Sequence, residues 1–129
     1  MKWTVPYKPL SGLPFPLIPI EIHGVGIVDA LVDSGASVSL FEISIAKVLG
    51  LPVESGARQI LGGAGGRIVA YRHELPVRVA GRLLPLKVCF SYEYTPSVSL
   101  LGRDNLFRNF LVTFDESGQK TILEWSDAS

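Results

Sequence analysis

The chain is 129 residues long, which is the size of one domain with its own hydrophobic core. Hydrophobic residues make up 47% of it and charged residues 19%, a composition that excludes intrinsic disorder. Twelve basic residues balance twelve acidic ones and the net charge is +0, so we expect no nucleic acid and no anionic membrane as partners.

Cysteine content and apolar runs narrow the class of protein further. Cys89 is the only cysteine, which excludes an intrachain disulfide and multi-cysteine metal sites and fits a reducing compartment. No apolar run approaches the roughly 18 residues of a membrane helix. Prolines interrupt the first residues, where a signal peptide would have an uninterrupted apolar core. We therefore expect a cytoplasmic protein.

The start of the chain predicts an arm followed by one β domain. Residues 1–16 carry four of the nine prolines and three aromatic residues, and we expect them to pack as an extended arm on a domain formed by residues 17–129. Two apolar runs, residues 17–23 and 27–33, lie on either side of a short glycine-containing turn. This pattern predicts a β-hairpin.

A helix and further strands are expected in the rest of the chain. Ser39 and Glu42 have the spacing of a capping box, and the apolar residues Phe41, Ile45 and Val48 follow at helical spacing, which predicts a helix of about ten residues. Alternating apolar segments then predict strands at residues 59–61, 67–71, 75–79 and 84–90. The last elements expected are a short helix at 104–109, a strand at 110–114, a turn at 115–118 and a strand at 121–125.

The most informative stretch is residues 31–36, Leu-Val-Asp-Ser-Gly-Ala, where an apolar strand ends in a carboxylate. A carboxylate is costly to bury without donors, which marks Asp33 as a candidate functional residue. Asp-Ser-Gly is also ordinary turn chemistry, and on this motif alone that alternative stays open. About 65 residues further along the chain, residues 100–104 read Leu-Leu-Gly-Arg-Asp before an apolar helix. The two segments together are more specific than either one.

These segments resemble the motifs of the retropepsin-like aspartic proteases, a single-lobe family that includes the retroviral proteases. Residues 31–36 are similar to the family's active-site loop, apolar-apolar-Asp-Thr/Ser-Gly-Ala, and residues 100–104 to its apolar-apolar-Gly segment before a short helix. The glycine-rich segment 60–69 lies where the family's flap belongs. The resemblance implies an all-β fold, a closed antiparallel barrel with one or two short helices, and a homodimer.

The resemblance also implies roles for particular residues. Asp33, Ser34 and Gly35 would form the catalytic loop, with Ser34 bonding the opposite loop across a two-fold axis and Gly35 permitting close backbone approach. The substrate-binding residues would be Ala36, Val38, Ile60, Leu61, Gly62, Gly63 and Ile68. A structural role falls to Leu100, Leu101, Gly102 and Arg103. The carboxylate that pairs with this arginine in retroviral members lies four residues after the catalytic aspartate, where this chain has Ser37, so the partner of Arg103 is open.

Peptide hydrolysis by this route needs two carboxylates, one ionised to take a proton from water and one protonated to hold the carbonyl oxygen. The chain offers one apolar-apolar-Asp-Ser-Gly motif. Asp115 is followed by Glu116 and is typical of a surface hairpin turn, and Asp29 is typical of a solvated strand carboxylate. We therefore expect the second carboxylate to be Asp33 of another subunit, with no cofactor.

The expected substrate is a protein or peptide held in an apolar cleft. Leu31, Ala36 and Val38 would form its floor, and Ile60, Leu61, Ile68 and Val69 its roof, so we expect apolar residues at the cleavage site and almost no charge in the cleft. Residues 62–66 lack the Lys-Ser/Thr of a phosphate loop and are expected to form a mobile flap tip. A surface loop without that function is the alternative.

Three remaining residues are expected to play no part in the chemistry. His23 and His73 are 50 residues apart without an obvious third ligand, so half-buried strand histidines are expected rather than a metal site. Cys89 is expected in the core.

The alternative function is a catalytically inactive dimeric β-domain that binds extended peptides by strand addition.

Overall fold

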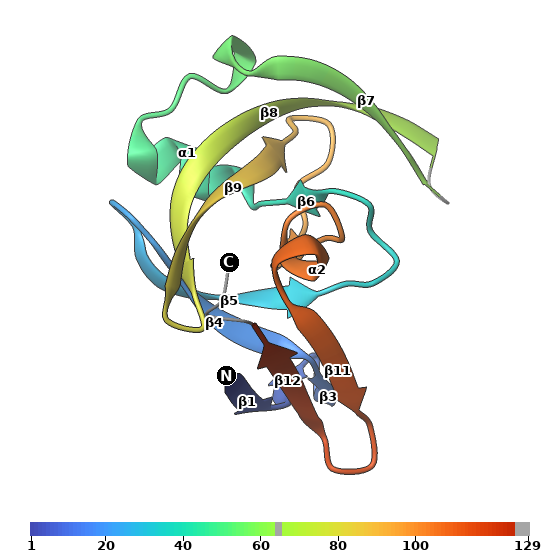
Figure 1. Cartoon of the computed structure of the whole chain (residues 1–129). Coiled ribbons are helices and arrows are strands. Elements are labelled where there is room, and N and C mark those ends of the chain that lie inside the picture. Colours follow the sequence, from blue (N-terminus) through green and yellow to red (C-terminus); the bar gives the residue numbers. More distant parts are fainter. Residues whose placement is uncertain (64–65, 126–129) are drawn as a thin grey trace.

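Six strands close on themselves into a barrel in the computed structural model, which describes residues 1–63 and 66–125 (Figure 1). In order around the barrel they are β4 (Leu17–Ile22), β5 (Gly26–Val32), β10 (Ser99–Leu101), β6 (Ser39–Leu40), β9 (Arg82–Phe90) and β8 (Gly66–Val79). The pairing of β4 with β8 closes the ring, and β7 (Ala57–Gly63) extends the sheet from β8. The expected closed β barrel is confirmed.

Alternating side chains build the barrel core. From Leu75 to Val79 in β8 and from Leu84 to Val88 in β9 every second residue is buried, and the residues between them face solvent. The buried residues are Leu75, Val77 and Val79 in β8 and Leu84, Leu86 and Val88 in β9. A two-residue turn joins the strands, with φ of 51° at Ala80 and 80° at Gly81. Positive φ at both positions matches the twist of the flanking strands and holds the hairpin in register.

Strand β10 lies between β5 and β6 and runs parallel to β5. A second parallel pairing joins β6 to β9, so the barrel is mostly rather than wholly antiparallel. Parallel strands cannot be joined by a tight turn, so a turn motif in the sequence cannot predict that they pair. This insertion brings the end of β10 beside residues 33–38, which connect β5 to β6.

The helices are short. Helix α1 (Ile43–Leu49) has seven residues where about ten were expected, and the expected capping box is wrong. Glu42 is the N-cap residue, and Ser39 lies in β6, where its buried hydroxyl accepts a hydrogen bond from a distant part of the chain. Gly50 ends the helix in the left-handed conformation with φ of 64°. A 3-10 turn (Val53–Ser55) and α2 (Leu106–Asn109) complete the set.

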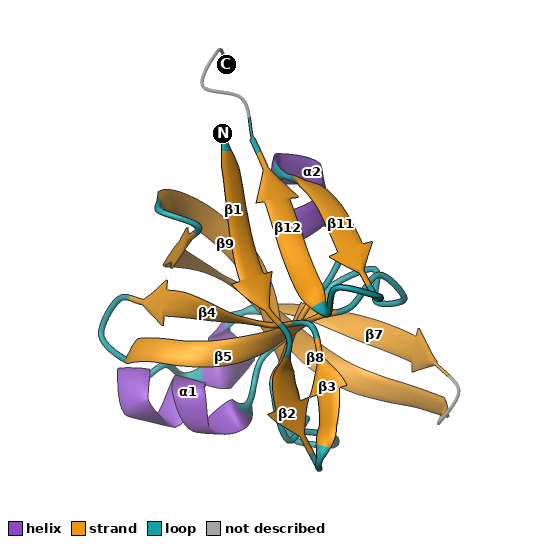
Figure 2. Ribbon diagram, turned by 90° about the horizontal axis from the view of Figure 1, so that it is seen from below, coloured by secondary structure: helices purple, strands orange, loops and turns teal. Residues whose placement is uncertain are grey.

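A second sheet is formed by β1 (Lys2–Pro6), β12 (Lys120–Glu124) and β11 (Leu111–Asp115), which lie side by side in Figure 2. Residues 1–16 thus supply β1 and the small hairpin of β2 (Lys8–Leu10) and β3 (Leu13–Phe15). Trp125 packs edge-on against Phe110 at 5.7 Å between ring centroids. Leu111 is 66% exposed on the outer strand β11.

Several smaller expectations were tested by the structure. Asp115 forms the expected hairpin turn, where the N–H of Gly118 donates to its carboxylate at 2.9 Å and lowers its pKa. The segments 67–71 and 75–79 belong to the one long strand β8. Val48 was expected on the buried face of α1 but is 65% exposed.

The two histidines differ from each other. His73 is a half-buried strand residue, as expected, and its Nε2 lies 2.7 Å from the carbonyl oxygen of Val53. For His23 the expectation is wrong, because it is exposed in the turn between β4 and β5. Cys89 is buried in β9 as expected, and burial raises the pKa of its thiol to about 11.

Among the residues described, no helix has the length and apolar character needed to span a membrane.

Candidate active site

Asp33 lies in a tight turn directly after β5. Its N–H donates to the carbonyl oxygen of Leu101 at 3.0 Å, and its own carbonyl accepts the N–H of Ala36 at 3.2 Å. Its Oδ1 accepts the N–H of Gly35 at 2.9 Å. Its Oδ2 accepts no hydrogen bond from the residues that the structure describes. The carboxylate is half-buried, held in one orientation, and retains one oxygen for an external partner.

Gly35 and Ser34 complete this turn. A Cβ atom at position 35 would lie 3.3 Å from Oδ1 of Asp33, which is tighter than ordinary van der Waals contact. A side chain there would crowd the carboxylate, so the close approach expected of Gly35 has a steric basis. Ser34 is exposed and available to a neighbouring chain. The structure has the turn that both alternatives require, and the catalytic role of Asp33 stays a prediction.

The segment after β10 supports this turn from beneath. Gly102 is buried, and a Cβ atom on it would overlap the carbonyl group of Val38 and lie 2.9 Å from the oxygen of Ala36. The N–H of Arg103 donates to the Ala36 oxygen at 2.8 Å. Only glycine allows the two segments to lie so close. In the described part of the chain the exposed side chain of Arg103 forms no ion pair, and its observed contribution is through its backbone.

Asn105 ties the same segment to β9. It is buried, and its Oδ1 accepts the N–H of Lys87 at 3.0 Å while its amide donates to the Lys87 oxygen and, at 3.4 Å, to Oγ of Ser39. The preceding residue, Asp104, is half-buried, and burial raises the pKa of its carboxyl, with Arg108 partly offsetting this. Sequence reasoning missed Asn105, because a polar residue before a short helix carries no signal of such a role.

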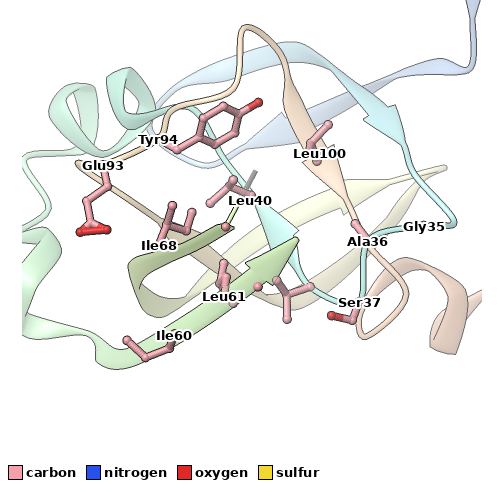
Figure 3. Close-up of a pocket in the computed structure, with 13 residues that line it drawn as sticks. Gly35, Ala36, Ser37, Leu40, Ile60, Leu61, Ile68, Glu93, Tyr94 and Leu100 are labelled. Atoms are coloured by element: carbon pink, nitrogen blue, oxygen red, sulfur yellow. The ribbon is translucent and has the colours of Figure 1, made fainter. Parts of the chain in front are cut away.

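A cavity of about 730 Å³, called the cleft below, opens between the Asp33 turn and the β7–β8 hairpin (Figure 3). Seven of the predicted site residues line it, and they come from three separate stretches of the chain. They are Gly35, Ala36, Val38, Ile60, Leu61, Gly62 and Ile68. The backbone of Gly63 pairs with Gly66 at the end of the hairpin, while Ala64 and Gly65 lie outside the described residues.

The cleft differs from expectation at several positions. Leu31 and Val69 are not among its lining residues. Six residues were missed, namely Ser37, Leu40, Gly66, Glu93, Tyr94 and Leu100. The expectation of an almost uncharged cleft is therefore wrong at Glu93. Glu93 lies near Ile68 because the loop after β9 runs beside β8. No local sequence pattern predicts this contact between distant segments.

A closed barrel whose Asp-Ser-Gly turn rests on a glycine segment, with a cleft above it, is the arrangement of a single-lobe aspartic protease. A family model described as "Aspartyl protease" matches residues 18–104, which include both the Asp33 turn and Gly102. The chain therefore belongs to the aspartyl protease family.

Solved structures with the same fold agree with this assignment. A retropepsin-like aspartic protease from Rickettsia conorii superposes with a TM-score of 0.72 at 22% identity, covering 95% of this chain and 98% of that one. The EIAV protease complexed with the inhibitor HBY-793 has a TM-score of 0.59 at 22% identity, covering 73% and 86%. At this identity the likeness concerns the fold. A search of curated proteins found no match.

Proposed function

We propose that this chain is an aspartic endopeptidase that acts as a homodimer, with Asp33 of each subunit forming the catalytic pair. The observation that carries the proposal is the fixed Asp33 turn at one end of a cleft large enough for peptide side chains. Cavities of roughly 300–1,000 Å³ are typical of ligand sites.

The chemistry requires the two carboxylates to share one proton. The ionised carboxylate takes a proton from water, whose oxygen attacks the peptide carbonyl carbon while the protonated carboxyl donates to the carbonyl oxygen. One hydroxyl of the tetrahedral intermediate then returns a proton to the carboxylate that had donated one, and the C–N bond breaks as the other carboxyl gives its proton to the nitrogen, which restores the singly protonated pair. Two like charges held close together are costly, which favours the singly protonated pair.

A second subunit is needed because the other candidate carboxylates have different surroundings. Asp29 forms an ion pair with Lys8 at 2.8 Å, and Asp115 is bonded within its own hairpin turn. Neither lies in an Asp-Ser-Gly turn at the end of an apolar strand, as Asp33 does. The exposed hydroxyl of Ser34 is available to bond the opposite loop across the two-fold axis.

The sheet of β1, β12 and β11 is proposed to provide much of the dimer interface. Its outer strand β11 exposes Leu111, which pairs with Glu124 of β12. The next residue, Trp125, is half-buried at the same end of the sheet. An exposed strand edge with apolar side chains is a ready surface for another chain. Sedimentation velocity tests this part, and Leu111→Asp is expected to weaken the dimer and activity together. A fully active monomer would contradict it.

The β7–β8 hairpin is proposed to act as the flap. Ile60, Leu61 and Ile68 face the cleft and favour apolar side chains next to the scissile bond. Hairpin backbone can also pair with an extended peptide. Closure over the substrate would exclude water from the site of hydrolysis.

Cleavage of a denatured protein at acid pH tests the function, with Asp33→Asn as the matched control. The wild-type chain is expected to cut at apolar residues, and the variant to lose at least about a hundredfold in rate. Equal rates would contradict the role of Asp33. A wild-type chain that binds peptides without cutting them would support the inactive peptide-binding alternative instead.

A further inference from the structure

Where β9 ends at Phe90, two side chains of the following loop continue the pairing with β8. Oγ of Ser91 donates to the carbonyl oxygen of Val69 at 2.7 Å, and the N–H of Val69 donates to Oε1 of Glu93 at 2.9 Å. Ser91 Oγ also accepts the N–H of Glu93 at 3.1 Å and of Tyr94 at 3.3 Å. The loop is thus bound to the middle of the β7–β8 hairpin, and two hydrogen bonds fix the position of Glu93.

Glu93 places a negative charge in the cleft. It is the one charged side chain among the described residues that line the cavity. Figure 3 shows Glu93 and Tyr94 at the end of the cleft opposite Gly35 and Ala36. The charge therefore lies away from the Asp33 turn, and the apolar lining near the scissile bond is not interrupted.

We infer that this end of the cleft is a subsite for a basic side chain, lysine or arginine, of the bound peptide at a position removed from the scissile bond. The inference rests on the proposed function, because it assigns a substrate class to the same cleft. One carboxylate oxygen of Glu93 is bonded to Val69, and the hydrogen bonds of the described residues leave the other free for an ammonium or guanidinium group. The ring of Tyr94, which also lines the cleft, offers an apolar surface for the methylene stem of such a side chain.

A purely architectural role for Glu93 can be separated from this one. Glu93→Gln keeps a carbonyl oxygen that can accept the N–H of Val69 but removes the charge. Glu74→Gln is the matched control, because it removes the same charge from β8 at an exposed position that does not line the cleft. An architectural role alone would leave the preference for basic residues unchanged in Glu93→Gln.

The experiment compares peptides that carry an apolar cleavage site and one lysine, scanned along the flanking positions, with norleucine peptides of the same length. At one flanking position lysine is expected to raise kcat/KM by about threefold to tenfold in the wild-type chain. The ratio is expected to fall to about one in Glu93→Gln and to persist in Glu74→Gln. It is also expected to shrink as salt is added, because exposed charges are screened.

Binding to the Asp33→Asn variant keeps the inference separate from the proposed function. Fluorescence anisotropy with the same peptides is expected to show tighter binding of the lysine peptide, and Glu93→Gln in this background is expected to abolish the difference. Selective binding with no cleavage by the wild-type chain would overturn the protease proposal and support the subsite. Cleavage without any lysine preference, or a preference that survives Glu93→Gln, would overturn the subsite and leave the protease proposal intact.

Discussion

The N–H of Gly102 donates a hydrogen bond to the buried hydroxyl of Ser39 at 3.0 Å, although 63 positions separate the two residues. This contact joins the end of β10 to β6 and holds the Asp33 turn against its support. Ser39 also accepts a hydrogen bond from the amide of Asn105 at 3.4 Å. The site is therefore positioned by a buried polar network whose members lie far apart in the chain.

Gly102→Ala is expected to destabilise the fold by about 1–3 kcal/mol, because the added methyl group would overlap the Val38 carbonyl. Chemical denaturation measures the change. Gly62→Ala is the control, since nothing lies within 4 Å of a Cβ atom there and its φ is not positive. Equal stability of the two variants would show that β10 and the 33–38 loop are less closely packed than described.

Asp104→Asn is expected to stabilise the chain more at neutral pH than in acid. Burial raises the pKa of the Asp104 carboxyl, so its contribution to stability is present below the ordinary value of 3.8 and is lost as pH rises through the raised pKa. Asparagine has no such loss. The difference in Tm, variant minus wild type, should therefore grow more positive as pH rises.

Asp115→Asn should show the opposite dependence. Its pKa is lowered by the Gly118 N–H, so the carboxylate contributes stability above its ordinary pKa and loses it as pH falls through the lowered one. The variant should be less stable than wild type at neutral pH, and the gap should close in acid. Parallel pH profiles for the two variants would contradict both assignments.

The rate of peptide cleavage is expected to be greatest in mildly acid solution. The proposed mechanism needs one shared proton in the Asp33 pair, so kcat/KM should fall at higher pH, where that proton is lost, and at lower pH, where a second is gained. A pH profile on an apolar peptide measures this. A maximum in alkali would be incompatible with a carboxylate pair.

Gly63→Pro is expected to slow turnover by about tenfold or more, because proline removes a backbone N–H and restricts φ at the end of the β7–β8 hairpin. Steady-state kinetics provide the measurement, and thermal unfolding checks that the barrel remains intact. Unchanged kinetics in a folded variant would place substrate closure elsewhere.

Much of the β structure could be predicted from the sequence because its signals are local. Alternating apolar residues predicted β8 and β9, and an aspartate at the end of an apolar strand marked Asp33 as a candidate functional residue. Side chains on one face of a strand recur every second residue, so an alternation of apolar and polar residues predicts which side chains are buried. The Gly102 segment was recognisable by a different signal, its resemblance to the family's apolar-apolar-Gly motif.

Tertiary structure alone decided the rest. Ser39 has the spacing of a helix cap, yet its hydroxyl binds Gly102, because a buried polar group bonds whichever partner the fold brings to it. Glu93 joins the cleft only because the loop after β9 is bonded to Val69 of β8. The parallel pairings of β10 with β5 and of β6 with β9 likewise join distant segments. Such contacts depend on chain closure over long separations, which local residue patterns do not encode.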